Sequence, residues 1–340
     1  MKAFAFVVPA ITIKEIKNFW PLIRGMPTFL VAPFLKNMPP YKISQIKRLR
    51  SIQGEEIEGY FIACPLFLKH TQELEKENIV INKIIEAGRI AKRFGAKIIG
   101  LGGDASIIGD KIYTIAEKLK MPVTNGNALA AWSVFEAIYR MARIKKIDLK
   151  KCTLAVIGAT NFLGSLCAKK FSYYTTKIII TATHRDKLEQ LKEKILYLNS
   201  IEIIIEEDAH KAVKDADVVI ITSSLSDAPL NIEELTPNAI ICNASMPKNS
   251  IVGRTTASRD IAIIDGGLIK MPYPANLGIN TRLPKGIVHA FLAETMLLTF
   301  AERFVSYSLD DNINLDKLEE IADIAAQHGF EVWVPEAPVL

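Results

Sequence analysis

The sequence predicts a two-domain α/β protein. The chain has 340 residues, 49% of them hydrophobic, and its short apolar runs alternate with stretches of helical periodicity. The length favours two domains over one. The alternation predicts strands joined by helices, and the apolar content excludes general disorder.

The composition also limits the setting of the protein. No apolar run is long enough to span a bilayer, and the start of the chain lacks the apolar core of a signal peptide. We therefore expect a cytoplasmic protein. Its four cysteines form no CxxC pair, so we expect buried thiols and neither a zinc site nor a disulfide framework. These cysteines are Cys64, Cys152, Cys167 and Cys242.

Charge is distributed unevenly along the chain. Residues 1–50 carry nine Lys or Arg and one acid, a net charge of +8, whereas the whole chain carries +5. A basic segment attracts anionic partners such as a membrane surface, a phosphorylated cofactor or an acidic carrier protein. The alternative is a solvated basic face. We expect no nucleic-acid partner, and a peripheral contact with a membrane is the second possibility for localisation.

The first domain is expected to span residues 1–150. A long helix is predicted over 71–94, because Gly95 follows a basic last turn. A glycine-rich turn from Gly100 to Ser106 follows a strand, and a further helix is expected over Ala128–Arg143. The predicted strands of this domain are Phe4–Val8, Thr28–Val31, Glu58–Ala63 and Lys97–Leu101.

A charged junction, Lys145–Lys151, precedes the second domain, which we expect over residues 151–288. An apolar strand, Thr153–Ile157, runs into a glycine turn and then a helix near Ser165. This order of strand, glycine turn, helix and strand is required by a dinucleotide-binding Rossmann fold. The predicted cofactor-binding turn comprises Gly158, Ala159, Thr160, Asn161, Phe162, Leu163 and Gly164.

Each glycine of this turn has a separate expected role. Gly158 lets the chain turn sharply towards a pyrophosphate, and Gly164 allows the helix to approach the sheet closely. Asn161 stands where a middle glycine is common. We expect the turn to survive because asparagine tolerates positive φ better than most residues.

The end of the next strand, Lys177–Thr181, concerns the choice of nicotinamide cofactor. An acid there would bind the ribose 2′-hydroxyl of NAD. The chain has Thr183, His184 and Arg185 instead, which suit a 2′-phosphate. NADP(H) is therefore the expected cofactor. Asp186 nearby argues against a 2′-phosphate, and the alternative is that Thr183, His184 and Arg185 form a solvated loop with no role in binding.

Further strands are predicted over Ile201–Ile205, Val218–Ile221, Ala239–Asn243 and Ile261–Ile264. Ligands bind outside the carboxyl ends of parallel strands, so the loops that follow form the expected rim of the site. Residues on these loops are predicted to contact the cofactor: Thr222, Ser223, Ser224, Met246, Gly266 and Gly267.

These motifs together resemble those of the long-chain fatty acyl-[acyl-carrier-protein] reductases, from about Gly59 to Phe330. The family implies NADPH-dependent conversion of acyl thioesters to aldehydes, and its domain order looks like that of shikimate dehydrogenases. It also implies C-terminal helices, residues 289–340, that pack back on the first domain. The resemblance is carried by Gly102-Gly103, Thr124-Asn125-Gly126-Asn127, Gly158-Ala159-Thr160, Pro247-Lys248-Asn249, Gly266-Gly267, Ala293-Glu294 and His328-Gly329-Phe330.

The chain departs from this family at the nucleophile. The family has a cysteine two residues before the matched Ala293-Glu294 pair, and this chain has Phe291 there. Thioester reduction through an acyl-enzyme needs a thiolate at that point. His289 lies two positions away on the predicted helix Ile287–Phe304, which would put it on a different face from Phe291.

Three functions therefore remain open. The first is NADP-dependent reduction of an acyl or carbonyl group, and the second is a small-molecule dehydrogenase acting on a keto, hydroxy or amino acid. The third is an NADP-binding sensor without catalysis. Hydride transfer to a carbonyl needs a proton donor and an orienting group, and a structural role is the alternative for each candidate. The candidates are Asp104, Asn127, Lys248 and His289.

Overall fold

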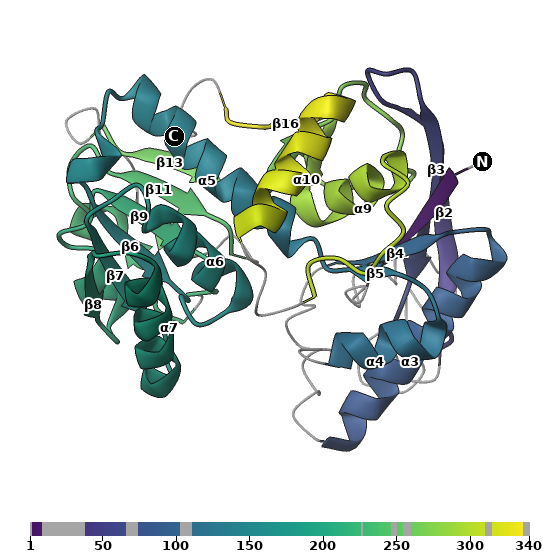
Figure 1. Cartoon of the computed structure of the whole chain (residues 1–340), viewed down its shortest axis with the longest axis horizontal. Coiled ribbons are helices and arrows are strands. Elements are labelled where there is room, and N and C mark those ends of the chain that lie inside the picture. The colour runs from purple at the N-terminus through teal and green to yellow at the C-terminus, as the bar shows by residue number, and fades with distance from the viewer. Residues whose placement is uncertain are drawn as a thin grey trace. The chain divides into compact units, whose positions relative to one another are not determined.

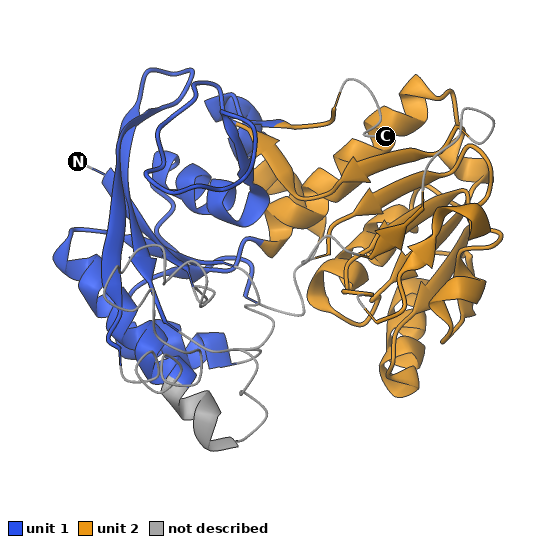
Figure 2. Ribbon diagram, turned by 180° about the vertical axis from the view of Figure 1, so that it is seen from behind, with its two compact units in different colours: residues 1–126, 271–312, 323–331 blue, residues 127–270, 313–322, 332–340 orange. Residues whose placement is uncertain are grey.

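The computed structural model describes residues 2–8, 38–65, 74–102, 111–225, 227–245, 250–253, 260–309 and 315–335, without the side chains of 74–79. The chain forms two compact units, which Figure 2 shows in different colours. Unit 1 comprises residues 1–126, 271–312 and 323–331. Unit 2 comprises residues 127–270, 313–322 and 332–340.

Unit 1 is built on a five-stranded sheet in the order β2-β3-β1-β4-β5. Strands β3, β1, β4 and β5 run parallel, and β2 pairs antiparallel with β3. Helices α3 and α4 follow β3 and β4 along the chain (Figure 1). The bounds are β1 (Lys2–Val8), β2 (Tyr41–Arg50), β3 (Glu56–Ala63), α3 (Leu74–Arg93), β4 (Ile98–Leu101), α4 (Lys111–Leu119) and β5 (Val123–Thr124).

Strand alternation decides which helix covers each face of this sheet. Ala5 and Val7 of β1 belong to a core shared with α3 and α4. Phe4 and Phe6 point to the opposite face because successive side chains of a strand alternate. That face is covered by α9 (Ala290–Phe300), with Phe6 against Phe291. The position of α9 over the sheet accounts for the burial of all its residues except Phe291, which is partly buried.

The edge strand β2 is an element that the sequence pattern does not predict. Its pairing with β3 shifts register between Lys42 and Ser44 and again between Ile46 and Leu49. These irregularities break the alternation of apolar and polar residues by which a strand is recognised. The predicted strand Thr28–Val31 lies outside the described residues.

Unit 2 contains a six-stranded parallel sheet in the order β13-β11-β9-β6-β7-β8. Numbered along the chain from β6, this is the order 3-2-1-4-5-6 of the dinucleotide-binding fold, read from the other edge. The strands are β6 (Thr153–Ile157), β7 (Lys177–Thr181), β8 (Glu202–Ile205), β9 (Val218–Ile221), β11 (Ile240–Asn243) and β13 (Ala262–Asp265).

Helices cover both faces of the unit 2 sheet. Ala155 and Ile157 of β6 belong to a core with Ala212 and Val213, at the end of α8. On the other face, α5 packs on α6, with the rings of Phe135 and Phe171 5.1 Å apart. The helices are α5 (Asn127–Ile144), α6 (Phe162–Phe171), α7 (Arg185–Leu198) and α8 (Ala209–Ala212), with 3-10 turns η4 (Leu149–Lys151) and η5 (Ile232–Glu234).

The compact units differ from the domain boundaries expected from the sequence. Unit 2 takes in α5, because that helix packs on α6 and β11. Its main segment ends at Lys270, whereas the expected boundary was residue 288. Helix α10 (Leu315–His328) is divided after Ala322 between the two units. The remaining strands are β10 (Leu230–Asn231), β12 (Ile251–Val252), β14 (Leu268–Lys270), β15 (Ile287–His289) and β16 (Glu331–Val332).

The first of the predicted C-terminal helices is shorter than expected. The predicted helix Ile287–Phe304 is a short strand, β15, followed by α9, which ends at Phe300. Within the part of the chain that the structure describes, no helix combines the length and the apolar character needed to cross a bilayer.

Candidate functional site: the glycine turn of unit 2 and the start of helix α9

A tight turn joins β6 to α6 at the carboxyl edge of the unit 2 sheet. Gly158 has a φ of +81°, a conformation that other L-residues rarely adopt. The amides of Gly158 and Ala159 both donate to the carbonyl oxygen of Thr181, at 2.9 and 3.0 Å. A Cβ on Gly158 would lie 2.6 Å from the Oγ of Ser223. The turn therefore requires glycine at this position, as the sequence predicts.

Asn161 holds the start of α6, but for a different reason from the one expected. Its φ is −78° and its ψ is 165°, so the residue is extended and does not use positive φ. It is the N-cap of α6, and its Oδ1 accepts from the amide of Gly164 at 2.8 Å. Asparagine is among the best N-cap residues. The helix consequently begins at Phe162, three residues before the predicted start.

Thr222 ties this turn to the neighbouring strand β9. Its Oγ1 lies 2.9 Å from the carbonyl oxygen of Ile157 and 3.1 Å from that of Gly158, as a donor. The Nδ2 of Asn161 donates to Thr222 at both Oγ1 (3.0 Å) and the carbonyl oxygen (3.1 Å). A Cβ on Gly164 would overlap the carbonyl oxygen of Gly158. Thr222 thus holds the turn in place through these hydrogen bonds, and its predicted contact with the cofactor stays a prediction.

The start of α6 is suited to an anion. The first amides of a helix have no acceptor within the helix, and the helix dipole places positive partial charge there. Asn161 satisfies the amide of Gly164, so the amides of Phe162 and Leu163 are the two that precede it in the first turn. Such a helix start beside a glycine turn is the phosphate site of dinucleotide-binding folds.

Arg185 lies where the sequence predicts a 2′-phosphate contact. It is the first residue of α7, directly after the N-cap His184, and both side chains are exposed. Its guanidinium pairs with Glu207 at 3.0 Å and with Glu189 at 3.6 Å. Surface ion pairs of this kind contribute about 0 to 1 kcal/mol, so an incoming phosphate can compete for the arginine. Glu207, which follows β8, is a neighbour that the sequence analysis overlooks.

The other residues expected at the rim of the site differ in their surroundings, and some lie outside the described residues. Gly266 follows β13, and a Cβ there would lie 2.9 Å from both Val134 of α5 and Cys242, so its small size serves packing. Gly267 has a φ of +78° and open space around its Cα. Ser223 lies against Gly158. Met246 and Lys248 fall outside the residues that the structure describes, as does Asp104 of the first domain.

Phe291, where the acyl-reductase resemblance leads us to expect a nucleophile, lies at the start of α9 in unit 1. His289 is the N-cap of this helix, with φ −69° and ψ 144°, and Phe291 is the second helical residue. Their rings stack with centroids 4.9 Å apart, and Phe291 in turn stacks on Phe6 at 6.0 Å. The expectation that His289 and Phe291 lie on different faces is wrong, because an N-cap is extended rather than helical.

Two motifs of the acyl-reductase resemblance meet beside this stack. The hydroxyl of Thr124 donates to the carboxylate of Glu294, which is fully buried, and accepts from the amide of Gly126 at 3.2 Å. Gly126 has a φ of +75°, and a Cβ there would overlap the backbone of Phe291. These residues therefore lock the loop after β5 onto the start of α9. Asn127, the other predicted residue here, is the first residue of α5.

The burial of the cysteines argues against a nucleophilic role for them. All four are buried. Burial raises the pKa of Cys64 to about 12 and that of Cys152 to about 11, and it also raises the pKa of Cys167. A thiol with a raised pKa is a poor nucleophile at neutral pH, since the thiolate is the reactive form.

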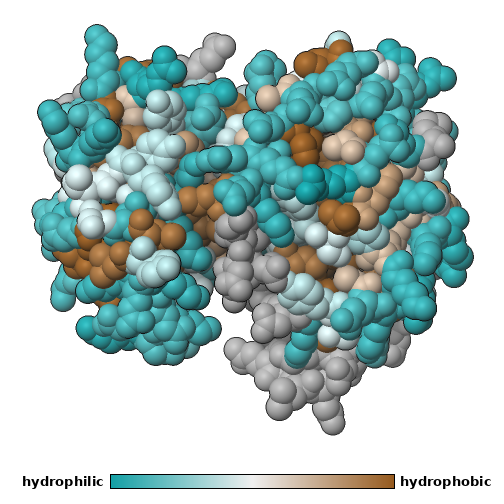
Figure 3. Space-filling view, in the orientation of Figure 1, coloured by the Kyte–Doolittle hydropathy of each residue, from teal (hydrophilic) through white to brown (hydrophobic). Residues whose placement is uncertain are grey.

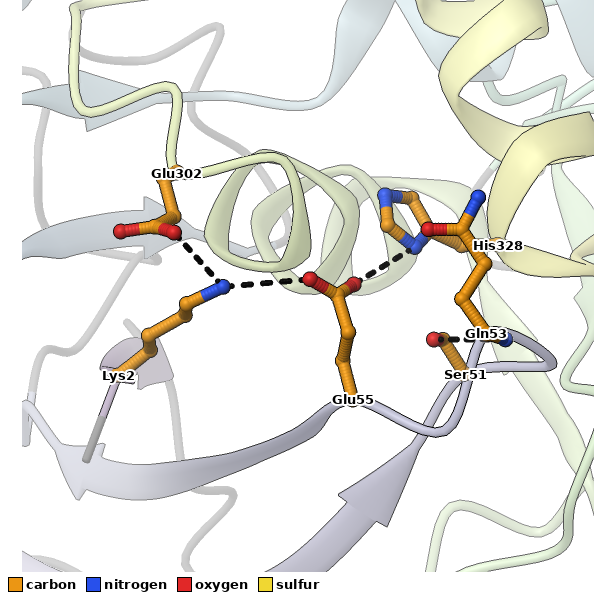
Figure 4. A network of polar contacts seen from close by, with 6 residues as sticks. All are labelled: Lys2, Ser51, Gln53, Glu55, Glu302 and His328. Atoms are coloured by element: carbon orange, nitrogen blue, oxygen red, sulfur yellow. Dashed lines mark hydrogen bonds and ion pairs between the residues drawn. The ribbon is translucent and has the colours of Figure 1, made fainter.

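A second polar cluster joins β1, the turn after β2 and the end of α10 within unit 1 (Figure 4). Lys2 lies between Glu302 (2.9 Å) and Glu55 (3.3 Å). Nδ1 of His328 is 3.2 Å from the second oxygen of Glu55, and neither of these buried atoms makes a hydrogen bond to a described residue. Burial lowers the pKa of His328, against the opposing effect of Glu55. The ring of His328 stacks on Phe300 at 5.2 Å.

Geometry and connectivity thus define unit 2 as a Rossmann fold with a glycine turn between β6 and α6. No family model matches the sequence. The chain is 24% identical over 320 residues to the long-chain acyl-[acyl-carrier-protein] reductase of Synechococcus elongatus, covering 88% of this chain and 89% of that protein. It is 25% identical over 313 residues to the aminotransferase PigE of a Serratia species. That match covers 88% of this chain but only 35% of PigE.

Solved structures with similar folds include two dehydrogenases. The L-tryptophan dehydrogenase of Nostoc punctiforme is 15% identical, with a TM-score of 0.40, over 96% of this chain and 82% of that one. The quinate dehydrogenase of Corynebacterium glutamicum, solved with NAD, is 9% identical, with a TM-score of 0.36, over 71% of this chain and 79% of that one.

Proposed function

We propose that this chain is an NADP(H)-dependent oxidoreductase that reduces a carbonyl group by direct hydride transfer. The observation that carries the proposal is the glycine turn, which joins β6 to the capped start of α6 at the carboxyl edge of a Rossmann sheet. The similarity to a protein named as an acyl-[acyl-carrier-protein] reductase supports reductase chemistry in general. It does not by itself favour a substrate.

The residues of the turn fit a dinucleotide. The amides of Phe162 and Leu163, at the start of α6, are placed to bind the pyrophosphate, and Gly158 lets the backbone approach it. The reduced nicotinamide, when bound, supplies the hydride. Asn161 and Thr222 hold the turn in shape through their mutual hydrogen bonds, so that binding requires little rearrangement.

Arg185 supports NADP(H) over NAD(H). It follows β7, the strand at whose end NAD-binding folds carry an acid for the ribose hydroxyl. A guanidinium can bind a 2′-phosphate through two parallel hydrogen bonds. Glu207 holds the same guanidinium at 3.0 Å, so this carboxylate competes with the phosphate and sets the degree of preference.

A free carbonyl is favoured over a thioester as the substrate. Phe291 occupies the position of the family's nucleophile, and the cysteines are buried, with a raised pKa at Cys64 and Cys152. Reduction of a ketone, aldehyde or imine needs a hydride and a proton but no enzyme nucleophile. His289 is our first candidate for the proton donor, because its ring lies at the start of α9 and is only partly buried. Asp104, Asn127 and Lys248 remain the other candidates.

The second candidate function is a small-molecule dehydrogenase acting on a keto, hydroxy or amino acid, which likewise needs no cysteine nucleophile. The third is a non-catalytic NADP-binding sensor. We further propose a cytoplasmic protein, since buried thiols suit a reducing compartment. An acidic partner for the basic N-terminal segment is also a proposal. In the described part of that segment, Arg50 pairs with Glu56, and Lys42 lies over the ring of Phe94.

The test is NADPH consumption by the full chain. Ketones, aldehydes, keto acids and cyclic imines are compared with long-chain acyl-ACP and acyl-CoA, with direct detection of aldehyde. Turnover of a free carbonyl without aldehyde production from thioesters is the expected result. Aldehyde from a thioester would overturn the choice of substrate, and tight NADPH binding without any turnover would favour the sensor.

A further inference from the structure

The amino edge of the unit 2 sheet, opposite the glycine turn, carries an unusual group of exposed side chains. Strands of a parallel sheet all begin at one edge, and here the chain also reaches that edge at the ends of α6 and α7. The face of the molecule seen in Figure 3 is mainly hydrophilic, with smaller hydrophobic areas between the polar side chains. We define the amino-edge patch as Tyr173, Leu196, Tyr197, Leu198, Lys150, Lys151 and Lys194.

Hydrogen bonds hold the three segments of the patch together. Asn199, directly after α7, donates through Nδ2 to the Oγ of Ser172 at 2.6 Å, which brings the end of α7 beside Tyr173. The hydroxyl of Thr176 donates to the carbonyl oxygen of Lys150 at 3.3 Å. The amide of Glu202 donates to the carbonyl oxygen of Thr176 at 2.9 Å. These hydrogen bonds place the three segments next to one another at the amino edge of the sheet.

The apolar part of this surface is more exposed than the core of the unit requires. Tyr197 is 91% exposed, Leu196 and Leu198 are each 44% exposed, and Tyr173 is 49% exposed. The buried face of α7 is formed by other residues, Leu188, Leu191 and Ile195. Tyr197 thus lies almost wholly in water, and the leucine on either side of it is a little under half exposed. Large apolar side chains grouped in this way at a helix end favour an interaction surface over a single scattered exposed residue.

Cations surround these side chains. Lys150, Lys151 and Lys194 are all exposed. Nearby acids offset part of this charge, because Asp148 caps η4 and Glu202 pairs with Lys177 at 3.4 Å. Segment 144–151 nevertheless carries four lysines and one acid, although Lys145 pairs with Asp260 at 2.7 Å. The end of α7 adds Lys192 and Lys194, with Glu193 between them. The patch combines positive charge with leucine and tyrosine.

We propose that the amino-edge patch docks this protein on an anionic lipid bilayer. Tyrosine and leucine flanked by lysine is the combination that enters the interface between headgroups and acyl chains. Lysines gain from the negative surface potential of such a membrane. The lysines favour an anionic occupant, and the exposed tyrosine and leucine side chains favour one with an apolar layer beneath its charge. The surface lies at the opposite edge of the sheet from the glycine turn, so docking leaves that turn accessible.

The experiment uses the full chain and vesicles of phosphatidylcholine, with or without phosphatidylglycerol. We expect co-sedimentation with the anionic vesicles only, decreasing as salt is raised. Tyr197→Ser/Leu198→Ser and Lys150→Glu/Lys151→Glu should each reduce the bound fraction at least about fivefold, from the loss of apolar and charge contacts respectively. Tyr197→Trp should show a blue shift of tryptophan emission with the anionic vesicles.

Matched controls separate the patch from general effects. Lys92→Glu/Lys97→Glu changes exposed lysines of unit 1 and lowers the net charge equally, and it should leave binding almost unchanged. Tyr273→Ser removes a tyrosine outside the patch that is 52% exposed, and it should also leave vesicle binding almost unchanged. NADPH binding reports the fold of each variant. Equal loss in patch and control variants, or no binding to anionic vesicles, overturns the proposal. A dimer in solution that Tyr197→Ser dissociates would instead make the patch a protein interface.

Discussion

The N-cap of α6 offers a substitution that separates cofactor binding from folding. Asn161→Asp keeps an oxygen for the amide of Gly164, because aspartate and asparagine are equally good N-caps. It removes the two hydrogen bonds from Nδ2 to Thr222, worth about 1 kcal/mol each. The carboxylate gains from the helix dipole by up to about 1 kcal/mol. We therefore expect the free energy of unfolding to fall by about 1 to 2 kcal/mol.

The effect of Asn161→Asp on the cofactor should be larger than its effect on stability. A new negative charge would stand beside the site where we place the pyrophosphate. Two like charges about 4 Å apart repel by about 1 kcal/mol in water and about 4 kcal/mol near a protein surface. NADPH affinity should therefore fall by at least about fivefold. Isothermal titration calorimetry measures the affinity, and urea unfolding measures the stability.

Two comparison variants sharpen this experiment. Asn231→Asp makes the same change at another N-cap of unit 2, where the side chain accepts from the amide of Glu233 at 3.1 Å, and should leave NADPH affinity unchanged. Asn161→Ala loses the cap as well and should cost about 2 to 3 kcal/mol of stability. If Asn161→Asp bound NADPH as tightly as the parent protein, the phosphates could not lie at the start of α6.

Four other predictions concern single side chains. Arg185→Ala should weaken binding of NADPH far more than that of NADH in parallel titrations, and equal losses would remove the case for a 2′-phosphate site. Gly126→Ala should cost more than about 2 kcal/mol in urea unfolding, because φ is +75° and the new Cβ would overlap Phe291; a neutral change would contradict the packing of α9. Phe291→Cys should not by itself produce aldehyde from acyl thioesters, since a thiolate needs an activating environment, and strong aldehyde formation would show an otherwise intact reductase site. Because burial lowers the pKa of His328 in the folded state, stability should fall as the pH drops below about 6.5, where the unfolded chain takes up the proton first; urea titrations of His328→Gln should show a smaller fall, and an identical pH profile would refute this.

Much of unit 2 follows from local sequence signals. The strands Thr153–Ile157 and Lys177–Thr181 were predicted with their observed bounds, because apolar runs of a parallel sheet are short and bounded by turns. The predicted α/β class and the Rossmann unit are confirmed by the strand order. The boundary between the two units was harder to predict. Helix α5 belongs to unit 2 because it packs on α6 and β11, and no local pattern in the sequence indicates that packing.

The chemistry of the turns was only partly accessible from the sequence. The sharp turn at Gly158 was predicted correctly, since a positive φ at that position follows from the motif, and its part in binding a pyrophosphate stays a prediction. The N-cap role of Asn161 was missed, although an asparagine directly before the apolar start of a helix is a recognisable cap signal. The pairing of Thr124 with Glu294 could not be foreseen, because the two residues lie far apart in the chain and meet only in the folded unit.

The most direct test of the central claim is an equilibrium titration of the full chain with NADPH and NADH, followed by nicotinamide fluorescence. The account predicts saturable binding of both, with NADPH bound more tightly, and loss of that preference in Arg185→Ala. Absence of saturable binding of either nucleotide would contradict the assignment of the glycine turn as a dinucleotide site.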